Sequence, residues 1–202
     1  MSSLLTDEQP LPIQLDGETQ LWLWQQVLPC DQAQQLLQHL RDSLPWEQPQ
    51  LHLFGKHHPI PRLASWHGDA SYRYSGKLFA PHPWTPELRQ ACHLAETLTG
   101  KRFNSVLCNL YRNGDDRMGW HADDEPELGA SPWIASLSLG AKRDFCLKRK
   151  GEHQTFLRLA LPHNSLLLMA PAVQQHWQHA LPSRKREREA RLNLTFRHLL
   201  TG

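Results

Sequence analysis

No stretch of about 18 consecutive apolar residues occurs in the sequence, so no transmembrane helix and no membrane partner are predicted. The first twenty residues also lack a basic segment followed by an apolar one, and we expect no secretory signal. Their prolines and polar residues predict a loose lead-in over residues 1–20. Residues 21–202 suffice for one domain with its own hydrophobic core.

Cysteine is scarce, and none of its residues forms a C-x-x-C pair, which argues against a structural zinc site and a disulfide framework. We therefore expect a reduced protein in the cytoplasm, most simply that of a bacterium. The net charge of +2 is also small, so overall basicity does not indicate nucleic-acid binding. Two segments, FGKHHPIPR (54–62) and SRKREREAR (183–191), are locally basic, and charge alone favours solvated loops for both.

A Gly-rich phosphate loop and an alternation of strands with helices are both missing, which argues against a nucleotide-binding α/β fold. Two amphipathic helices are predicted instead, one at 31–44 with Asp31 as N-cap and one from Thr85 to Gly100. After Gly100 the pattern changes to short strands separated by turns, at 103–111, 133–140, 144–150, 155–161, 165–170 and 191–199. This order predicts a β barrel or jelly roll with the helices packed outside it.

The segment GWHADDEPELG (119–129) places His121 and Asp123 two residues apart. In an extended segment these side chains share a face and can hold one metal ion. A third ligand must come from elsewhere, and the segment HWQHALP offers His176 and His179. Two histidines and one carboxylate are the ligand set of non-haem Fe(II) oxygenases. The H-x-D spacing alone is weak evidence, because the chain contains a second example at 67–69, whose Gly-Asp predicts a turn.

The last predicted strand, RLNLTFR, adds to this interpretation. Its apolar residues share one face, and its polar residues, Arg191, Asn193, Thr195 and Arg197, share the other. Buried arginines need an anionic partner, so the strand is either a surface edge strand or the wall of a pocket for a small dicarboxylate. Asn109 and Tyr111 share a face of an earlier predicted strand and can both donate hydrogen bonds.

Five motifs together resemble the AlkB family of Fe(II)- and 2-oxoglutarate-dependent dioxygenases, and most of all its subgroup that acts on duplex DNA. They are FGKHHPIPR, YRYSG, NLYRNGDDRMGWHADDE, IASLSLGAKRDF and HWQHALPSRKREREARLNLTFR, in this order. The resemblance implies a mostly β fold with flanking helices (α+β). Its parts are a double-stranded β-helix, or jelly-roll, core at 101–202, N-terminal helices packed outside it, and a nucleotide-recognition lid at about 50–80. It also implies Fe(II), 2-oxoglutarate as co-substrate, and O₂.

Residue by residue, the resemblance implies three groups of functional side chains. The iron ligands are His121, Asp123 and His179, the last preferred over His176. The residues that bind 2-oxoglutarate are Asn109, Tyr111, Arg191, Asn193, Thr195 and Arg197. The residues that contact the substrate are Phe54, Gly55, Lys56, Tyr72, Tyr74, Asp124, Glu125, Arg184, Lys185 and Arg186. Within this last group, Phe54 is the wedge, Tyr74 stacks on the flipped base, and Asp124 and Glu125 lie beside it.

The expected function is repair of alkylated DNA by oxidative demethylation of bases such as 1-methyladenine and 3-methylcytosine, with release of formaldehyde, succinate and CO₂. The expected partner of the monomeric enzyme is double-stranded DNA with a flipped base, and single-stranded DNA or RNA is the alternative. Two other functions stay open: an AlkB-like oxygenase that acts on RNA or protein, and a catalytically silent nucleic-acid-binding module. The complete set of predicted ligands argues against the silent module.

Overall fold

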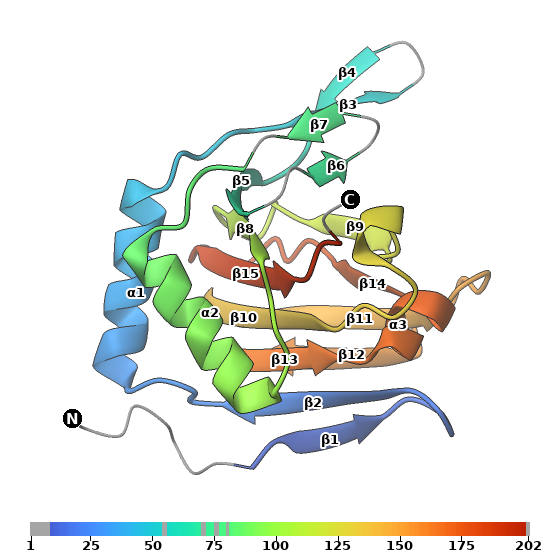
Figure 1. Cartoon of the computed structure of the whole chain (residues 1–202). Coiled ribbons are helices and arrows are strands. Elements are labelled where there is room, and N and C mark those ends of the chain that lie inside the picture. Colours follow the sequence, from blue (N-terminus) through green and yellow to red (C-terminus); the bar gives the residue numbers. More distant parts are fainter. Residues whose placement is uncertain (1–8, 54–55, 70–71, 75–76, 80, 201–202) are drawn as a thin grey trace.

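Two antiparallel β-sheets pack face to face and form a jelly roll (Figure 1). The computed structural model describes residues 9–53, 56–69, 72–74, 77–79 and 81–200. In sheet order, the major sheet consists of β1 (Leu11–Gln14), β2 (Gln20–Gln25), β13 (Ser165–Met169), β10 (Ile134–Gly140), β15 (Arg191–Arg197), β8 (Ser105–Tyr111) and β5 (Leu63–Gly68). The minor sheet consists of β12 (Leu157–Leu161), β11 (Arg143–Arg149), β14 (Trp177–Leu181) and β9 (Met118–His121). The predicted fold is confirmed.

Alternation of side chains along the strands separates two apolar layers. On β15, Leu192, Leu194 and Phe196 are fully buried in the layer between the major sheet and the helices. A second layer, which includes Leu147 and Trp177, lies between the two sheets. The polar side chains of β15 point to the opposite face of the sheet from its apolar ones. They therefore face the space between the sheets and line a cavity there.

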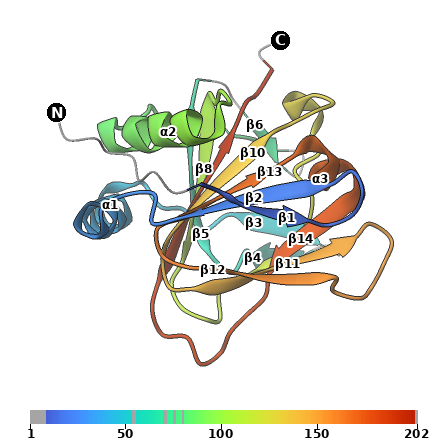
Figure 2. The ribbon, with the colours of Figure 1, turned by 90° about the horizontal axis from the view of Figure 1, so that it is seen from below.

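Two helices, α1 (Cys30–Ser43) and α2 (Pro86–Thr99), cover the outer face of the major sheet, on the side away from the minor sheet (Figure 2). The predicted ends of α2 are confirmed. The Thr85 hydroxyl oxygen accepts a hydrogen bond from a backbone amide of the first turn at 3.2 Å, and Gly100 ends the helix with a left-handed φ of 66°. The helices therefore seal the apolar side of β15 and leave its polar side to the cavity.

Two predictions for the N-terminal region are wrong. Pro29, and not Asp31, precedes α1; Asp31 lies in the first turn, where its charge favours the positive end of the helix dipole. The second error concerns residues 11–14 of the predicted loose lead-in, which form β1 and pair with β2, whereas residues 1–8 lie outside the described residues. Proline is tolerated in an edge strand, and β1 is the outermost strand of the major sheet, so Pro12 does not prevent pairing.

Two hairpins project beyond β5, at the top of the molecule in Figure 1. They consist of β3 (Gln50–Leu53) with β4 (Lys56–Pro59), and of β6 (Tyr72–Tyr74) with β7 (Lys77–Phe79). Both lie in the segment predicted as a lid, whose role stays a prediction. There are two short helices. η1 (Pro126–Leu128) follows β9, and α3 (Pro171–His176) directly precedes β14. Among the described residues, no helix has the length and apolar character to span a membrane.

Candidate active site

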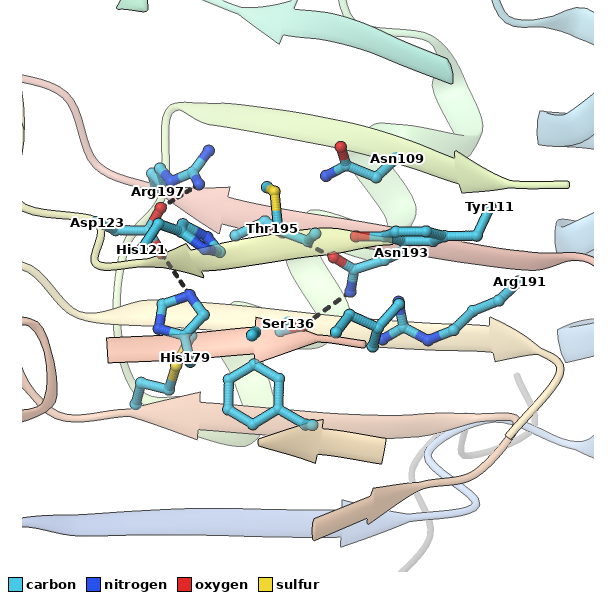
Figure 3. Close-up of a pocket in the computed structure, with 15 residues that line it drawn as sticks. Asn109, Tyr111, His121, Asp123, Ser136, His179, Arg191, Asn193, Thr195 and Arg197 are labelled. Atoms are coloured by element: carbon cyan, nitrogen blue, oxygen red, sulfur yellow. Dashed lines mark hydrogen bonds and ion pairs between the residues drawn. The ribbon is translucent and has the colours of Figure 1, made fainter. Parts of the chain in front are cut away.

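Three ionisable side chains meet at one end of the space between the sheets (Figure 3). His121 ends β9 and lies opposite His179 of β14, and Asp123 follows His121 by two residues. The candidate ligand atoms of these three residues lie within 4.8 Å of one another. In the described part of the chain, no other group of histidine, cysteine, aspartate and glutamate side chains has this geometry. The fold thus brings the three predicted metal ligands together.

The two histidines can offer their Nε2 atoms to one metal ion. The Nδ1 of His121 is 2.9 Å from the carbonyl oxygen of Gly119, which can only accept, so Nδ1 donates to it and Nε2 is the ring atom left for a metal ion. The Nε2 of His179 is 3.6 Å from a carboxylate oxygen of Asp123. Burial and the neighbouring His121 lower the pKa of His179 to about 3, so this ring is neutral at pH 7, as a metal ligand must be.

Asp123 is a buried carboxylate, 2% exposed, that stays ionised. Burial alone would raise the pKa of its carboxyl, but the charge of Arg197 and the neighbouring histidine rings outweigh that effect and lower the pKa to about 2. Arg197 donates a hydrogen bond from Nη2 to one carboxylate oxygen. The Asp123 backbone amide donates to the Gln174 side-chain oxygen at 3.0 Å. The donor set of one anionic oxygen and two imidazole nitrogens fits Fe(II) with three ligands on one face.

At the other end of the cavity, Arg191 is 2% exposed and has no anionic partner among the described residues. Its Nη2 donates to the Ser138 hydroxyl at 2.8 Å, its guanidinium lies 5.4 Å from the Tyr111 ring centroid, and its Nε has no hydrogen-bond partner. Burial lowers the pKa of Arg191 to about 10. A buried guanidinium with unused donors is suited to a carboxylate that enters from solution.

The wall between the two ends is a chain of polar groups on neighbouring strands (Figure 3). Asn193 donates from Nδ2 to the Ser136 hydroxyl at 2.7 Å and accepts from the Thr195 hydroxyl at 2.9 Å. The Asn109 side-chain oxygen accepts from Arg62 at 2.8 Å, which leaves the amide nitrogen of Asn109 free to donate. The cavity has a volume of about 40 Å³. All six residues predicted to bind 2-oxoglutarate line it: Asn109, Tyr111, Arg191, Asn193, Thr195 and Arg197.

The structure places the alternative histidines elsewhere. His176 is exposed at the end of α3, whereas His179 is buried in the cavity wall. In the second H-x-D, His67 is buried in β5, where its Nδ1 is 2.8 Å from the Pro83 carbonyl oxygen and its Nε2 is 2.9 Å from the Ser65 hydroxyl. Both ring nitrogens of His67 are therefore used within the fold, and the prediction that this motif is not a metal site agrees with the geometry.

The described members of the predicted substrate group, Asp124, Glu125 and Arg184–Arg186, do not line the cavity. Asp124 is exposed and forms an ion pair with Lys150 at 2.7 Å, and Glu125 is half-buried. The basic run Arg184–Arg186 is exposed on the loop between β14 and β15. The placements of Phe54 and Gly55, and the side chains of Lys56, Tyr72 and Tyr74, lie outside the described residues. The substrate roles of all these residues stay predictions.

Several residues that line the cavity or hold its lining side chains were not predicted. Ser136 and Ser138 hold Asn193 and Arg191, and their alternation with apolar residues in IASLSLG was a signal of an inward-facing polar side. Gln174 contacts Asp123 from another element, and no local pattern marks it. The remaining unpredicted lining residues are apolar or sulfur-containing: Met118, Phe145, Met169, Ala180 and Leu181.

Comparison with known proteins agrees with this site. Residues 20–197 match the family model of the 2OG-Fe(II) oxygenase superfamily. The human alpha-ketoglutarate-dependent dioxygenase alkB homolog 3 is 40% identical over 190 residues, which cover 90% of this chain and 66% of the relative. The human DNA oxidative demethylase ALKBH2 is 42% identical over 157 residues, or 73% of this chain and 60% of the relative. The chain thus spans just under two thirds of the length of these relatives.

A solved structure shows the same fold at low sequence identity. OsALKBH1 superposes with a TM-score of 0.61 and 14% identity, over 88% of this chain and 97% of that one. At this identity the likeness concerns the fold alone. The family model covers the helices, both sheets and the three candidate ligands, and so the chain belongs to the 2OG-Fe(II) oxygenase superfamily, within it to the AlkB family.

Proposed function

We propose that the protein is an Fe(II)- and 2-oxoglutarate-dependent dioxygenase that removes methyl groups from alkylated bases of DNA. The observation that carries the reaction class is one cavity that holds both a complete ligand triad and, at its other end, a buried arginine without an anion. A metal site alone would suit many functions. The additional demand for a carboxylate is what a 2-oxoglutarate enzyme requires.

The residues of the chain divide the work along the cavity. His121, Asp123 and His179 would hold Fe(II), and Arg191 would pair with the distal carboxylate of 2-oxoglutarate beside Tyr111. When bound, Fe(II) supplies the activation of O₂ that oxidises 2-oxoglutarate to succinate and CO₂ and hydroxylates the substrate methyl group. The hydroxymethylated base then releases formaldehyde.

Arg197 has a separate part in this scheme, because it keeps Asp123 ionised and orients its carboxylate. The apolar lining residues Phe145 and Met169 exclude water from the reacting centre.

The DNA part of the proposal rests on two kinds of support. One relative is named a DNA oxidative demethylase, and this chain presents an exposed basic loop, Arg184–Arg186, of the kind that contacts phosphates. Methylation at N1 of adenine or N3 of cytosine gives a positively charged base, which nearby carboxylates such as Asp124 and Glu125 would favour over neutral bases. A damaged base also costs less to flip out of the duplex than a normal one.

The oligomeric state and the cellular location stay proposals of the same kind. We propose a monomer in a reducing cytoplasm, and the four cysteines, which are free, agree with such a compartment.

The experiment measures formaldehyde and succinate released from a duplex oligonucleotide with one 1-methyladenine. The protein is loaded with Fe(II) without oxygen and is assayed in air with and without 2-oxoglutarate, beside His121→Ala. Single-stranded DNA and RNA of the same sequence form two further arms. We expect both products from DNA only when 2-oxoglutarate is present, and none from the variant. Succinate without DNA demethylation would move the substrate to RNA or protein, and no turnover with iron bound would support a binding module.

A further inference from the structure

Trp120 is an exposed tryptophan beside the iron site. It is 38% exposed and lies in β9, immediately before the ligand His121. An exposed indole forgoes the favourable burial of a large apolar surface, and tryptophan is enriched where proteins bind partners. The other large exposed apolar side chains among the described residues are Leu11, Phe156 and Leu200, none of which adjoins a metal ligand in the sequence. The position of Trp120 therefore suggests that it binds a partner.

A lysine ammonium lies over the Trp120 ring. The Lys148 ammonium lies 5.1 Å from its ring centroid and also donates to the Glu152 carbonyl oxygen at 2.8 Å, which holds the side chain in place. No carboxylate among the described residues forms an ion pair with Lys148. Lys150 lies two residues further along the chain and pairs with Asp124 at 2.7 Å. We call Trp120, Asp124, Lys148 and Lys150 the β9 outer face.

Strand β9 itself separates the β9 outer face from the cavity. His121 and Met118 of β9 line the cavity, whereas Trp120 does not and instead contacts Lys148 of β11. β9 is the last strand of the minor sheet, and Figure 1 shows it on the side of the molecule where the hairpins project. Gly119 is exposed, and a Cβ atom there would meet no atom within 4 Å. A polynucleotide can therefore pass from the cavity over this strand edge without a side-chain barrier at Gly119.

We propose that the Trp120 ring is the stacking platform for the base next to the alkylated one on the same strand, with Lys148 and Lys150 on its phosphates. The inference rests on the proposed function, because it assumes that a nucleic-acid strand enters the cavity. An aromatic face with adjacent cations is the usual recipe for binding single-stranded nucleotides without sequence preference. Only β9, which is an edge strand, lies between a base in the cavity and the β9 outer face.

The test compares wild type with Trp120→Ala, Trp120→Phe and, as a matched control, Phe156→Ala. Phe156 is 58% exposed and directly precedes β12, the strand of the minor sheet farthest from β9. The substrates are a single-stranded oligonucleotide with one 1-methyladenine, the same strand with an abasic site on the 5′ or the 3′ side of the lesion, and 1-methyl-dAMP. Dissociation constants and kcat/KM are measured for each. We expect Trp120→Ala to bind the intact strand roughly 5- to 150-fold more weakly than wild type. Trp120→Phe and Phe156→Ala should bind it about as tightly as wild type.

The abasic strands distinguish stacking on Trp120 from an indirect effect of Trp120 on the metal site. This comparison can be made with the wild-type protein alone. In the wild type, an abasic site on one side of the lesion should weaken binding by a similar factor, and Trp120→Ala should add nothing to that loss. 1-Methyl-dAMP, which has no neighbouring base, should react equally with wild type and Trp120→Ala.

Equal losses on 1-methyl-dAMP and on the intact strand would show that Trp120 acts through His121, and the inference would fail. The inference would also fail if wild type bound both abasic strands as tightly as the intact strand. It would fail as well if Trp120→Ala bound the intact strand as tightly as wild type does. No demethylation of any substrate by the wild type would instead overturn the proposed function itself.

Discussion

Replacement of Arg191 by methionine should stabilise the protein without ligand and abolish its response to 2-oxoglutarate. Arg191 is 2% exposed, has one hydrogen bond to Ser138 and no anionic partner among the described residues. Replacing buried charges by apolar groups of similar volume is often stabilising by about 1–4 kcal/mol. Methionine is flexible enough to fill the space. For a domain of this size, each kcal/mol shifts Tm by about 2–4 °C, so a measurable rise is expected.

The effect on ligand binding has the opposite sign. Removal of one partner of a buried charge pair costs about 2–5 kcal/mol in affinity. At a 2-oxoglutarate concentration about 100 times the wild-type dissociation constant, the wild type gains about 2.7 kcal/mol of stability. The same concentration should give the Arg191→Met variant less than about 1 kcal/mol.

The assay is calorimetric or fluorescence-detected unfolding with Mn(II), with and without 2-oxoglutarate. Arg158→Met, which changes an exposed arginine of β12, is the matched control and should shift neither curve by more than about 0.5 kcal/mol. An Arg191→Met protein that melts below wild type without ligand and keeps the full 2-oxoglutarate shift would refute the reasoning. That outcome would mean that Arg191 serves the fold and not the carboxylate.

Three other changes test neighbouring parts of the structure. Gln174→Leu leaves the buried amide of Asp123 without its acceptor, so stability should fall by about 1–3 kcal/mol and Mn(II) affinity by about 10- to 100-fold in a metal titration. Burial lowers the pKa of His67, so below about pH 6.5 the unfolded chain binds a proton that the folded protein does not. The unfolding free energy of wild type, relative to His67→Gln, should therefore decrease as the pH falls from about 8 to 5. Gly114→Ala places a Cβ atom 1.8 Å from the carbonyl oxygen of Arg184, so the variant should lose at least about 1–3 kcal/mol in urea unfolding.

The controls use the same chemistry at permissive positions. Gln175→Leu changes the next, exposed residue of α3 and should leave Mn(II) affinity unchanged. Gly17→Ala introduces a Cβ atom with no atom within 4 Å and should be nearly neutral. A loss of Mn(II) affinity in Gln175→Leu as large as in Gln174→Leu would contradict the specific role of the Asp123 amide. A wild-type stability curve parallel to that of His67→Gln would contradict the pKa argument.

The second helix and the strands after Gly100, except β9 and β14, could be predicted because each is determined by its own residues. Alternation with period two in residues 191–197 assigned both faces of β15, and Thr85, Pro86 and Gly100 defined the ends of α2. The first strand, β1, could not be predicted in this way. It is short, contains Pro12, and is stabilised by pairing with β2, so its residues carry little strand signal of their own.

The sequence by itself determined the chemistry of the site. The i, i+2 spacing of His121 and Asp123 was compatible with a metal site and the polar face of β15 with an anion pocket, and the resemblance to the AlkB family assigned these roles. Only the tertiary structure decided which histidine completes the triad by geometry, because His179 meets His121 through the pairing of β14 with β9.

The supporting contacts were likewise decided by the fold. Arg143 is buried and donates to the backbone carbonyls of Asn113, Asp116 and Pro182, which are 27 to 39 residues distant in the chain. Gln174 reaches the Asp123 amide across 51 residues. Periodicity and capping report interactions within a few residues, whereas these contacts depend on how the two sheets close on each other. The physical division is therefore between local conformation, which the sequence pattern encodes directly, and long-range packing, which only the closed jelly roll supplies.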